Sequence, residues 1–519
     1  MDREAELRRS VVDSLTKGRQ NWHCLPVKHP SAVIVTCVME ELNAQKCQSQ
    51  QKTLLNGFCA FLEECPANWL FTDLKTDGII IYERLISTLT NSATLTTGSI
   101  NEDEAYKEDF TDITSKATIV FKILISFITK LDDFSHLGQE EADFRTAVLK
   151  NTLVDCVVLS AAYIGHHEWS NETTNKYASD LLERLCQVCY CDSIQELLCG
   201  CKSGIEEKTG TFIKKGIYRK VLQKLRPRLT RDTWKLEPAS RHVYKWCLLH
   251  VKHPFLSGHL DDVFPPALLL IDDYQLQNKI HGIQCLHHII NNVDPTELKW
   301  YGRAMVIYEA LHKQIYSREP ALLDELYPCL VDLLGVIERS PRKTDQPRKT
   351  NRYDEILQIT LTNMEMEQQI ILRRIYSKHL HLFVEKMGIT VVRHFKRLLR
   401  VVVEYLEVYD GPEETSRINM LKLLCLVVME TWPRMPNHVD MLLKSLLRLT
   451  FDMATDESTT PDNVKQTVLD FTTKCLVVLR KCCRQHVDSC FQEVSSIVDN
   501  ETVLRCINEV ISKPNDSEL

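Results

Sequence analysis

The stretch from Val263 to Asn292 constrains the fold more than any other part of this chain. An apolar run from Leu268 to Ile271 follows two prolines, the acidic pair ending at Asp273 indicates a turn, and a second helical pattern begins at Asn278. Two helices joined by a short turn form a helical hairpin. Because one hairpin cannot bury its apolar face alone, neighbouring hairpins must stack against it.

The second helix of this hairpin carries small residues where two helices can approach closely. Small and large residues share one helical face, a pattern that matches a HEAT repeat. In such repeats an acidic turn residue and a basic residue six positions later can pair from one repeat to the next. The predicted repeat-packing residues are Asp273, Lys279, Gly282, Cys285, Leu286 and Ile289.

The chain has 519 residues, more than a single hydrophobic core normally organises. It therefore forms either several domains or one solenoid that lengthens without thickening. Glycine and proline are scarce, at 16 and 18 residues, and the alternation typical of strands is hard to find. We predict an all-α fold, a HEAT-like helical-repeat solenoid wound as an α–α superhelix.

The last third repeats itself. Leu398–Arg400 recurs 48 residues later as Leu446–Arg448, and Cys425–Val428 recurs 50 residues later as Cys475–Val478. A proline recurs at an intermediate spacing of 49. These spacings lie close to the ~40–47 residues of HEAT-type hairpins, once longer loops are allowed.

Composition and periodicity divide the chain into six segments. They are an N-terminal helical segment (1–90), an acidic Ser/Thr-rich loop (91–112), helical repeats with Cys-rich and basic parts (113–232), central HEAT-like hairpins (233–339), a basic exposed loop (340–352) and C-terminal HEAT-like repeats (353–519). The helical patterns used below lie at 110–131, 141–163, 173–190, 211–225, 298–317, 321–338 and 353–387.

The N-terminus mixes acids and bases without an apolar core, and no apolar run approaches the ~20 residues that span a bilayer. Twenty cysteines, many on apolar helical faces, suit reduced thiols. The net charge of −7 argues against a protein built to neutralise nucleic acid. We expect a soluble intracellular protein of the cytoplasm, with the nucleus as a second location, and neither nucleic acid nor membrane as a partner.

A dense group of cysteines could hold zinc through four thiolates, Cys186, Cys189, Cys199 and Cys201. The second pair has C-x-C spacing, which suits a strand or turn better than a helix, and the first pair lies on an apolar helical face. A zinc site and buried structural thiols both remain open. His281, Cys285 and His288 also share one side of a helix, where packing and a metal site are the two alternatives.

Residues 208–231 contain nine bases and no acid, and a smaller basic stripe follows at 393–400. A solvated helix face is the plain interpretation. An acidic protein partner is the sharper one, ahead of nucleic acid or a phosphoinositide, because stacking aromatics are few. The candidate partner-binding residues are Lys215, Arg219, Arg226, Arg397, Arg400 and Trp432.

The common catalytic and nucleotide-binding motifs are missing from the sequence, including G-x-S-x-G, the phosphate-cradling G-x-x-x-x-G-K and H-E-x-x-H. We therefore predict no enzyme, no catalytic or cofactor-binding residue and no cofactor. In the last third, Met420–Met429 and Leu442–Leu449 are almost continuously apolar. Either these segments await another chain, or they are inner helices of the solenoid.

Two segments, PPALLLIDDYQLQNKIHGIQCLHHII at 265–290 and ETWPRMPNH at 430–438, resemble the TELO-two-interacting protein two family. The resemblance covers about Lys150 to the C-terminus. It implies a non-catalytic helical-repeat subunit of the Triple-T co-chaperone complex, with TELO-two and TELO-two-interacting protein one as partners. It further implies work with the ninety-kilodalton heat-shock chaperone and its R-two-T-P adaptor. The clients would be phosphatidylinositol-3-kinase-related kinases, including the target-of-rapamycin and DNA-damage checkpoint kinases.

Two other functions stay open beside that one. A karyopherin-like transport solenoid would bind a small GTPase or a basic signal peptide, and a zinc-stabilised module would use the cysteine group. The identity of the proteins that bind in stoichiometric amount distinguishes a transport solenoid from a co-chaperone subunit. A measurement of bound metal tests the zinc-stabilised module.

Overall fold

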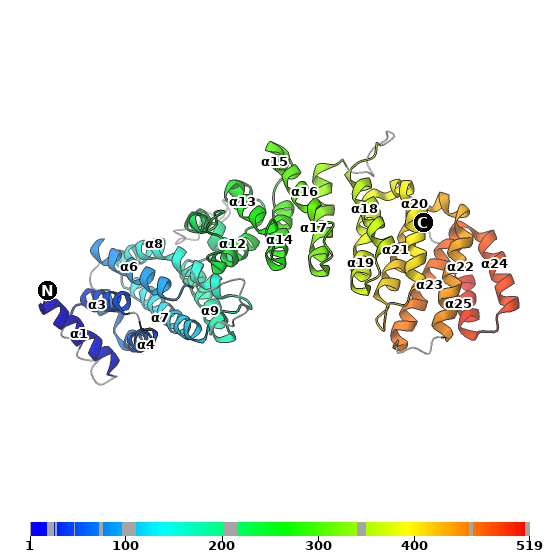
Figure 1. Ribbon diagram of the computed structural model, residues 1–519. Helices are drawn as coiled ribbons and strands as arrows, with labels where there is room; N and C mark the ends of the chain where they lie inside the picture. Colours follow the sequence, from blue (N-terminus) through cyan, green and yellow to red (C-terminus); the bar gives the residue numbers. More distant parts are fainter. Residues whose placement is uncertain are drawn as a thin grey trace. The chain divides into compact units, whose positions relative to one another are not determined.

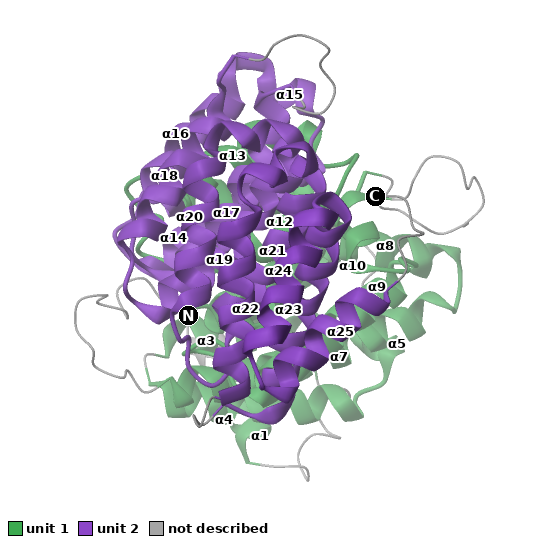
Figure 2. Cartoon of the chain, turned by 90° about the vertical axis from the view of Figure 1, so that its right-hand side faces the viewer, with its two compact units in different colours: residues 1–269 green, residues 270–519 purple. Residues whose placement is uncertain are grey.

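The computed structural model describes residues 2–17, 25, 29–45, 47–71, 76–95, 110–200, 215–339, 349–455 and 460–513. Every regular element within these ranges is a helix (Figure 1), which confirms the all-α prediction. The chain forms two compact units, Met1–Leu269 and Leu270–Leu519 (Figure 2). Their boundary falls within the segment 233–339, and the six-part division made from sequence remains a prediction. The loops predicted at 91–112 and 340–352 lie largely outside the described residues.

The first unit contains helices of very different length. They are α1 (Asp2–Thr16), α3 (Ser31–Ala44), α4 (Gln48–Glu64), α5 (Ala67–Leu70), α6 (Thr76–Ser92), α7 (Thr111–Ser135), α8 (Gln139–Tyr163), α9 (Glu172–Val188), α10 (Ile194–Cys199), α11 (Tyr218–Leu225) and α12 (Pro238–His250), followed by α13 (Leu260–Ile271), in which the unit ends. Helix α7 packs between α4 and α9, and α6 packs on α8. The patterns at 110–131, 141–163 and 173–190 thus correspond to α7, α8 and α9.

An aromatic cluster forms part of the core of the first unit. Phe71, just after α5, has its ring centroid 5.3 Å from Tyr82 of α6 and 5.4 Å from Phe127 of α7. Phe134 and Phe144 complete the cluster at 5.3 and 6.2 Å from Phe71. One ring therefore joins three long helices, because edge-to-face and tilted aromatic pairs are favourable at these separations.

Helix α8 is long and apolar enough, by length and composition, to span a membrane. The sequence was not expected to contain such a segment. However, 67 % of its apolar window is buried inside the first unit. Core packing therefore accounts for its composition, as it does for the inner helices of many folded domains.

The second unit stacks helical hairpins in two rows. Its helices are α14 (Leu276–Asn292), α15 (Pro295–Lys299), α16 (Arg303–Gln314), α17 (Pro320–Ile337), α18 (Arg352–Met366), α19 (Ile370–Met387), α20 (Phe395–Glu407), α21 (Thr415–Thr431), α22 (Val439–Thr455), α23 (Asp462–Cys482), α24 (Arg484–Ile497) and α25 (Glu501–Ser512). In the first row α14, α17, α19, α21, α23 and α25 each pack on the next, and α18, α20, α22 and α24 form the second row. This arrangement confirms the helical-repeat prediction (Figure 1).

The predicted hairpin packs closely around Gly282. A Cβ atom at Gly282 would lie 2.5 Å from the backbone nitrogen of Ile271, too close for any side chain. Cys285, Leu286 and Ile289 are fully buried on the same helix. Asp273 accepts a hydrogen bond from the Asn278 amide at 2.7 Å.

Lys279 donates a hydrogen bond to Gln314 of the neighbouring helix α16 at 3.4 Å. The Gln314 amide in turn donates to the carbonyl of Ile271 at 3.5 Å. The basic residue of the HEAT pattern thus reaches the next hairpin through a glutamine.

Gly282→Ala is expected to lower the free energy of unfolding by about 1–3 kcal/mol, because the added methyl group overlaps backbone. Alanine by itself favours a helix by roughly 1 kcal/mol over glycine, so a net loss would report the close contact. Chemical denaturation of the two proteins measures it. The matched control is Gly335→Ala in α17, where the nearest atom would be 3.7 Å away and a neutral or stabilising effect is expected. Equal effects at both glycines would contradict this account.

Three predicted helices differ from the structure. The pattern at 353–387 is two helices, because α18 ends at Met366 and α19 begins at Ile370. The pattern at 298–317 becomes a helix at Arg303, after a 3-10 turn over Trp300–Gly302. The helix expected at 211–225 begins at Tyr218, and residues 211–214 lie outside the described ranges.

Candidate partner-binding surfaces

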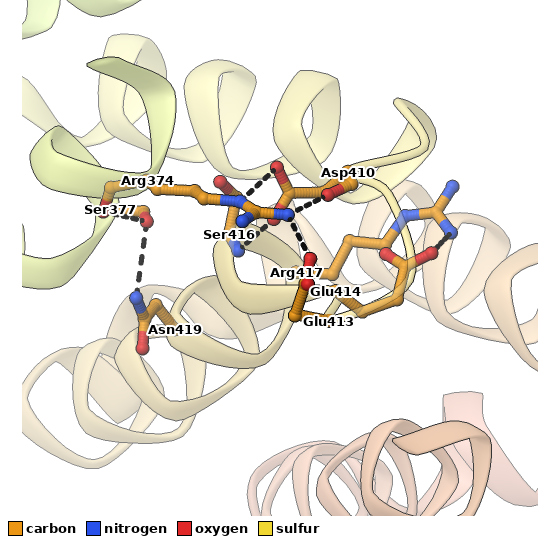
Figure 3. A network of polar contacts seen from close by, with 8 residues as sticks. All are labelled: Arg374, Ser377, Asp410, Glu413, Glu414, Ser416, Arg417 and Asn419. Carbon is orange, nitrogen blue, oxygen red and sulfur yellow. Dashed lines mark hydrogen bonds and ion pairs between the residues drawn. The ribbon is translucent and has the colours of Figure 1, made fainter. Parts of the chain in front are cut away.

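A network of ion pairs fixes the turn between α20 and α21 (Figure 3). Arg374, on α19, donates from Nε to the Asp410 carboxylate at 3.3 Å and from Nη2 to Glu413 at 2.8 Å. The same Nη2 donates to the Asp410 carbonyl oxygen. Asp410 is 3 % exposed and also accepts from the backbone N–H of Ser416, in the first turn of α21. One buried carboxylate therefore caps a helix and binds the preceding repeat.

A second ion pair lies deeper in the same turn. Arg417 donates to Glu414 at 3.2 Å, and both side chains are buried. Glu414 has a positive φ of 49°, in the left-handed region that non-glycine residues rarely adopt. The surrounding contacts therefore hold a strained turn in place.

The preceding hairpin turn is built the same way. Glu367, between α18 and α19, accepts from the backbone N–H groups of Gln368 and Gln369 at 3.0 and 2.9 Å. Arg318, just before α17, donates to both oxygens of Glu367 at 3.0 and 3.1 Å. These contacts hold the connection that divides the pattern at 353–387 into two helices.

Large apolar side chains remain exposed at these turns. In a stack of hairpins all turns that enter first-row helices lie at one edge, because equivalent helices run in the same direction. We name this set of residues the turn edge: Tyr274, Tyr316, Met366, Ile371, Tyr409, Phe451 and Ile497. Each lies near the start of a first-row helix or in the segment before it, with Phe451 in the C-terminal part of α22. Met366 is 77 % exposed and Ile497 is 79 % exposed. An apolar surface displayed from fixed turns is typical of a protein-binding site.

An aromatic corner lies at a connection that leaves a first-row helix. Trp300 and Tyr301 are 67 % and 90 % exposed between α15 and α16. Tyr301 has φ = 54° and is followed by Gly302 at φ = 68°. The Arg303 guanidinium lies 5.6 Å from the Tyr301 ring centroid. This corner was not among the predicted partner-binding residues, although adjacent aromatics beside a glycine were its visible signal in the sequence.

The predicted basic residues fall into two groups. Lys215, Arg219 and Arg226 are exposed on the first unit, around α11. Two neighbours in the same stretch are engaged, since Lys224 pairs with Asp155 and Arg228 lies 3.2 Å from Glu237.

In the second unit Arg400 and Trp432 are exposed, whereas Arg397 is half-buried. Arg397 donates to both oxygens of Glu365 at 2.8 and 2.6 Å. This pair lowers the pKa of Glu365, through the hydrogen bond first and the Arg397 charge second. The Arg397 guanidinium therefore joins α20 to α18, and partner binding by it stays a prediction.

Two of the candidate zinc residues, Cys186 and Cys189, are buried thiols in the first unit, and Cys199 is half-buried. Burial raises the pKa of Cys186 and of Cys199 to about 11 and raises that of Cys189 further. Cys201 lies outside the described residues. Among the residues that the structure does describe, no group of three or more His, Cys, Asp or Glu side chains could hold a metal ion. Nothing in these ranges therefore supports the zinc prediction.

The histidines of α14 make contacts along their own helix. His281 lies 3.0 Å from the Gln277 amide, and His288 lies 3.3 Å from the Asn292 amide. Cys285, between them, is fully buried. Within the described residues this geometry favours packing over a metal site.

The apolar segments of the last third are largely core. In α21 the residues Met420, Leu421, Leu423, Leu424, Val427 and Val428 are buried, and in α22 Leu442, Leu443, Leu446 and Leu449 are buried. Met429, Met441 and Phe451 remain exposed. Of the two alternatives left open by the sequence, inner helices therefore account for most of these residues.

Among solved structures, this chain is similar to Kap95p in its complex with RanGDP. That match has a TM-score of 0.48 and 11 % identity, over 93 % of this chain and 65 % of Kap95p. Kap121p bound to Pho4p gives a TM-score of 0.43 and 12 % identity, over 95 % of this chain and 48 % of Kap121p. Similarity at this level carries no information about function.

The sequence relatives are much closer. The Tti2 family matches residues 156–412. Over 343 residues the chain is 41 % identical to rat TELO2-interacting protein 2, which covers 66 % of this chain and 65 % of the rat protein. The chain thus spans slightly less than two thirds of that relative. Over 411 residues it is 36 % identical to mouse TELO2-interacting protein 2, covering 79 % of this chain and 78 % of the mouse protein, so it belongs to the Tti2 family.

Proposed function

We propose that this protein is a non-catalytic scaffold subunit of a Triple-T co-chaperone complex and binds TELO2 and TELO-two-interacting protein one. The observation that carries the proposal is the turn edge, a set of exposed apolar side chains, two of whose turns are fixed by arginines paired with the buried carboxylates of Glu367 and Asp410. Relatives that are 36–41 % identical are named for interaction with TELO2, which supports that partner. A surface that is already ordered loses little entropy on binding, so its apolar area contributes more fully to affinity.

In this role the protein acts in the cytoplasm, with the nucleus as a second location. It supports maturation and stability of phosphatidylinositol-3-kinase-related kinases together with the ninety-kilodalton heat-shock chaperone and the R-two-T-P adaptor. Burial raises the pKa of the thiols of Cys156, Cys247 and Cys329, so these cysteines are poor nucleophiles. This is consistent with a non-catalytic scaffold.

The test is affinity purification of the tagged full chain from cells, with Met366→Asp and Ile371→Asp combined. Both side chains are exposed, at 77 % and 63 %, so folding should be preserved. Recovery of TELO2 and TELO-two-interacting protein one is expected to fall at least about tenfold, as for a central apolar contact. Mass spectrometry of retained proteins provides the measurement.

The control is Leu137→Asp, at an apolar residue of the first unit that is also exposed, at 59 %, and this variant should retain both partners. Full recovery with the double variant would remove the turn edge from the proposal. Stoichiometric recovery of a small GTPase instead of TELO2 would favour the transport solenoid.

A further inference from the structure

Two cysteines of neighbouring repeats lie side by side in the second unit. Cys425 is on α21 and Cys475 is on α23, and their Sγ atoms are 3.2 Å apart. Both begin the string Cys-Leu-Val-Val that recurs after 50 residues, so they occupy the same position in successive repeats. Packing of α21 directly on α23 places these equivalent positions in contact.

The two thiols have different surroundings. Cys475 is fully buried, and its thiol also donates to the Leu421 carbonyl at 3.2 Å. Cys425 is half-buried. Lys422 and Lys474 flank it along the two helices, with their Nζ atoms 5.1 and 4.6 Å from the centroid of the Phe471 ring. The charge of Lys474 acts on the more accessible sulfur, that of Cys425.

These surroundings shift the pKa values of the two thiols in opposite directions. The hydrogen bond with Cys475, and then the charge of Lys474, lower the pKa of Cys425 despite its burial. Burial and the same hydrogen bond raise the pKa of Cys475. Cys425 is thus the thiol that more readily becomes a nucleophilic thiolate, and Cys475 remains protonated beside it.

We propose that Cys425 and Cys475 are a modification site, at which a hydroperoxide oxidises Cys425 and Cys475 then closes a disulfide between the two repeats. In the first step the Cys425 sulfur attacks one peroxide oxygen, an S–O bond forms, the O–O bond breaks and the leaving hydroxide takes a proton. In the second step the Cys475 sulfur attacks the resulting sulfenic acid, an S–S bond forms and water leaves. The two thiols lose two electrons in total, and hydrogen peroxide becomes two water molecules.

An S–S bond is about 2.05 Å long, so the two sulfur atoms, 3.2 Å apart, must approach by about 1 Å. The product joins α21 to α23, and a dithiol or glutathione-type thiol reverses it by exchange. Because α21 and α23 belong to the same row, the disulfide would lock adjacent repeats together.

The experiment treats the full chain with increasing hydrogen peroxide, alkylates the remaining thiols and maps tryptic peptides without reduction. The expected product joins peptide 423–434 to peptide 475–480. It should form in most molecules at low peroxide excess and disappear after dithiothreitol. Cys47 is exposed and provides an internal reference for the oxidising strength.

Two serine variants assign the roles. In Cys475→Ser the oxidation should stop at a sulfenic acid on Cys425, which dimedone traps, whereas in Cys425→Ser position 475 should stay unmodified. Cys247→Ser changes another buried thiol and should leave the linked peptide unchanged. If Cys47 is oxidised while Cys425 and Cys475 are both recovered alkylated, the proposal is wrong. That result concerns the isolated chain and leaves the TELO2 proposal untouched.

Discussion

Arg374→Met is expected to lower the free energy of unfolding by about 3–5 kcal/mol, because it removes the cation that pairs with a buried carboxylate. Asp410 is 3 % exposed and would keep the backbone N–H of Ser416 as a donor while losing two contacts to the guanidinium. Urea denaturation, followed by circular dichroism, measures the change. The loss should concentrate in the second unit, where protection of α19 and α21 amides from hydrogen exchange would fall.

Two further variants separate this buried pair from its exposed neighbour. Glu413→Gln removes the other ion pair of Arg374, but the Glu413 side chain is 62 % exposed, so solvent screens the pair and little change in the free energy of unfolding is expected. The double variant Arg374→Met with Asp410→Asn should recover part of the stability, since no unpaired charge remains buried. If Glu413→Gln costs as much as Arg374→Met, the buried carboxylate is not the source of the effect.

Phe71→Ala is expected to cost about 3–5 kcal/mol of unfolding free energy in the first unit. The ring is 0 % exposed and lies within 6.2 Å of four other aromatic rings, so its removal leaves a cavity among α6, α7 and α8. Thermal and urea denaturation provide the measurement. Exposure of the first unit's core should also speed amide exchange in α7.

The matched control for this substitution is Phe451→Ala in the second unit. That ring is 45 % exposed, so its loss should cost less than about 1 kcal/mol. A small effect of Phe71→Ala would mean that the surrounding rings collapse into the space and that the cluster does not hold the helices together.

The fixed turns also explain how a repeat protein can expose apolar side chains while its backbone stays ordered. Glu367 and Asp410 each bind one arginine from the preceding repeat. Glu367 also accepts from the two amides just before α19, and Asp410 accepts from the Ser416 amide in the first turn of α21. Met366 and Tyr409, beside them, are exposed but sit on an ordered backbone. Polar contacts thus stabilise the backbone at this edge, so the apolar side chains remain available to bind a partner.

The sequence determined the features that depend on neighbouring residues. Apolar periodicity and scarce glycine predicted helices, and the small residue Gly282 predicted a close helix contact that the backbone of Ile271 provides. The recurrence of Cys425 as Cys475 likewise indicated the repeat. These signals are short in range, so one chain without its structure is enough to detect them.

Tertiary structure alone decided which side chains meet across repeats. Arg374 and Asp410 are 36 residues apart in the sequence, and Arg397 and Glu365 are 32 residues apart. No local sequence pattern could therefore predict either pair. The break after Met366 was also hidden, because Ile370 and Ile371 continue the apolar pattern beyond a turn in which the Glu367 carboxylate accepts from two backbone amides. Hydrophobic periodicity reports which face of a helix is buried. It does not report which distant charge will pair with a buried carboxylate. Those long-range pairs hold the turns that carry the exposed apolar side chains.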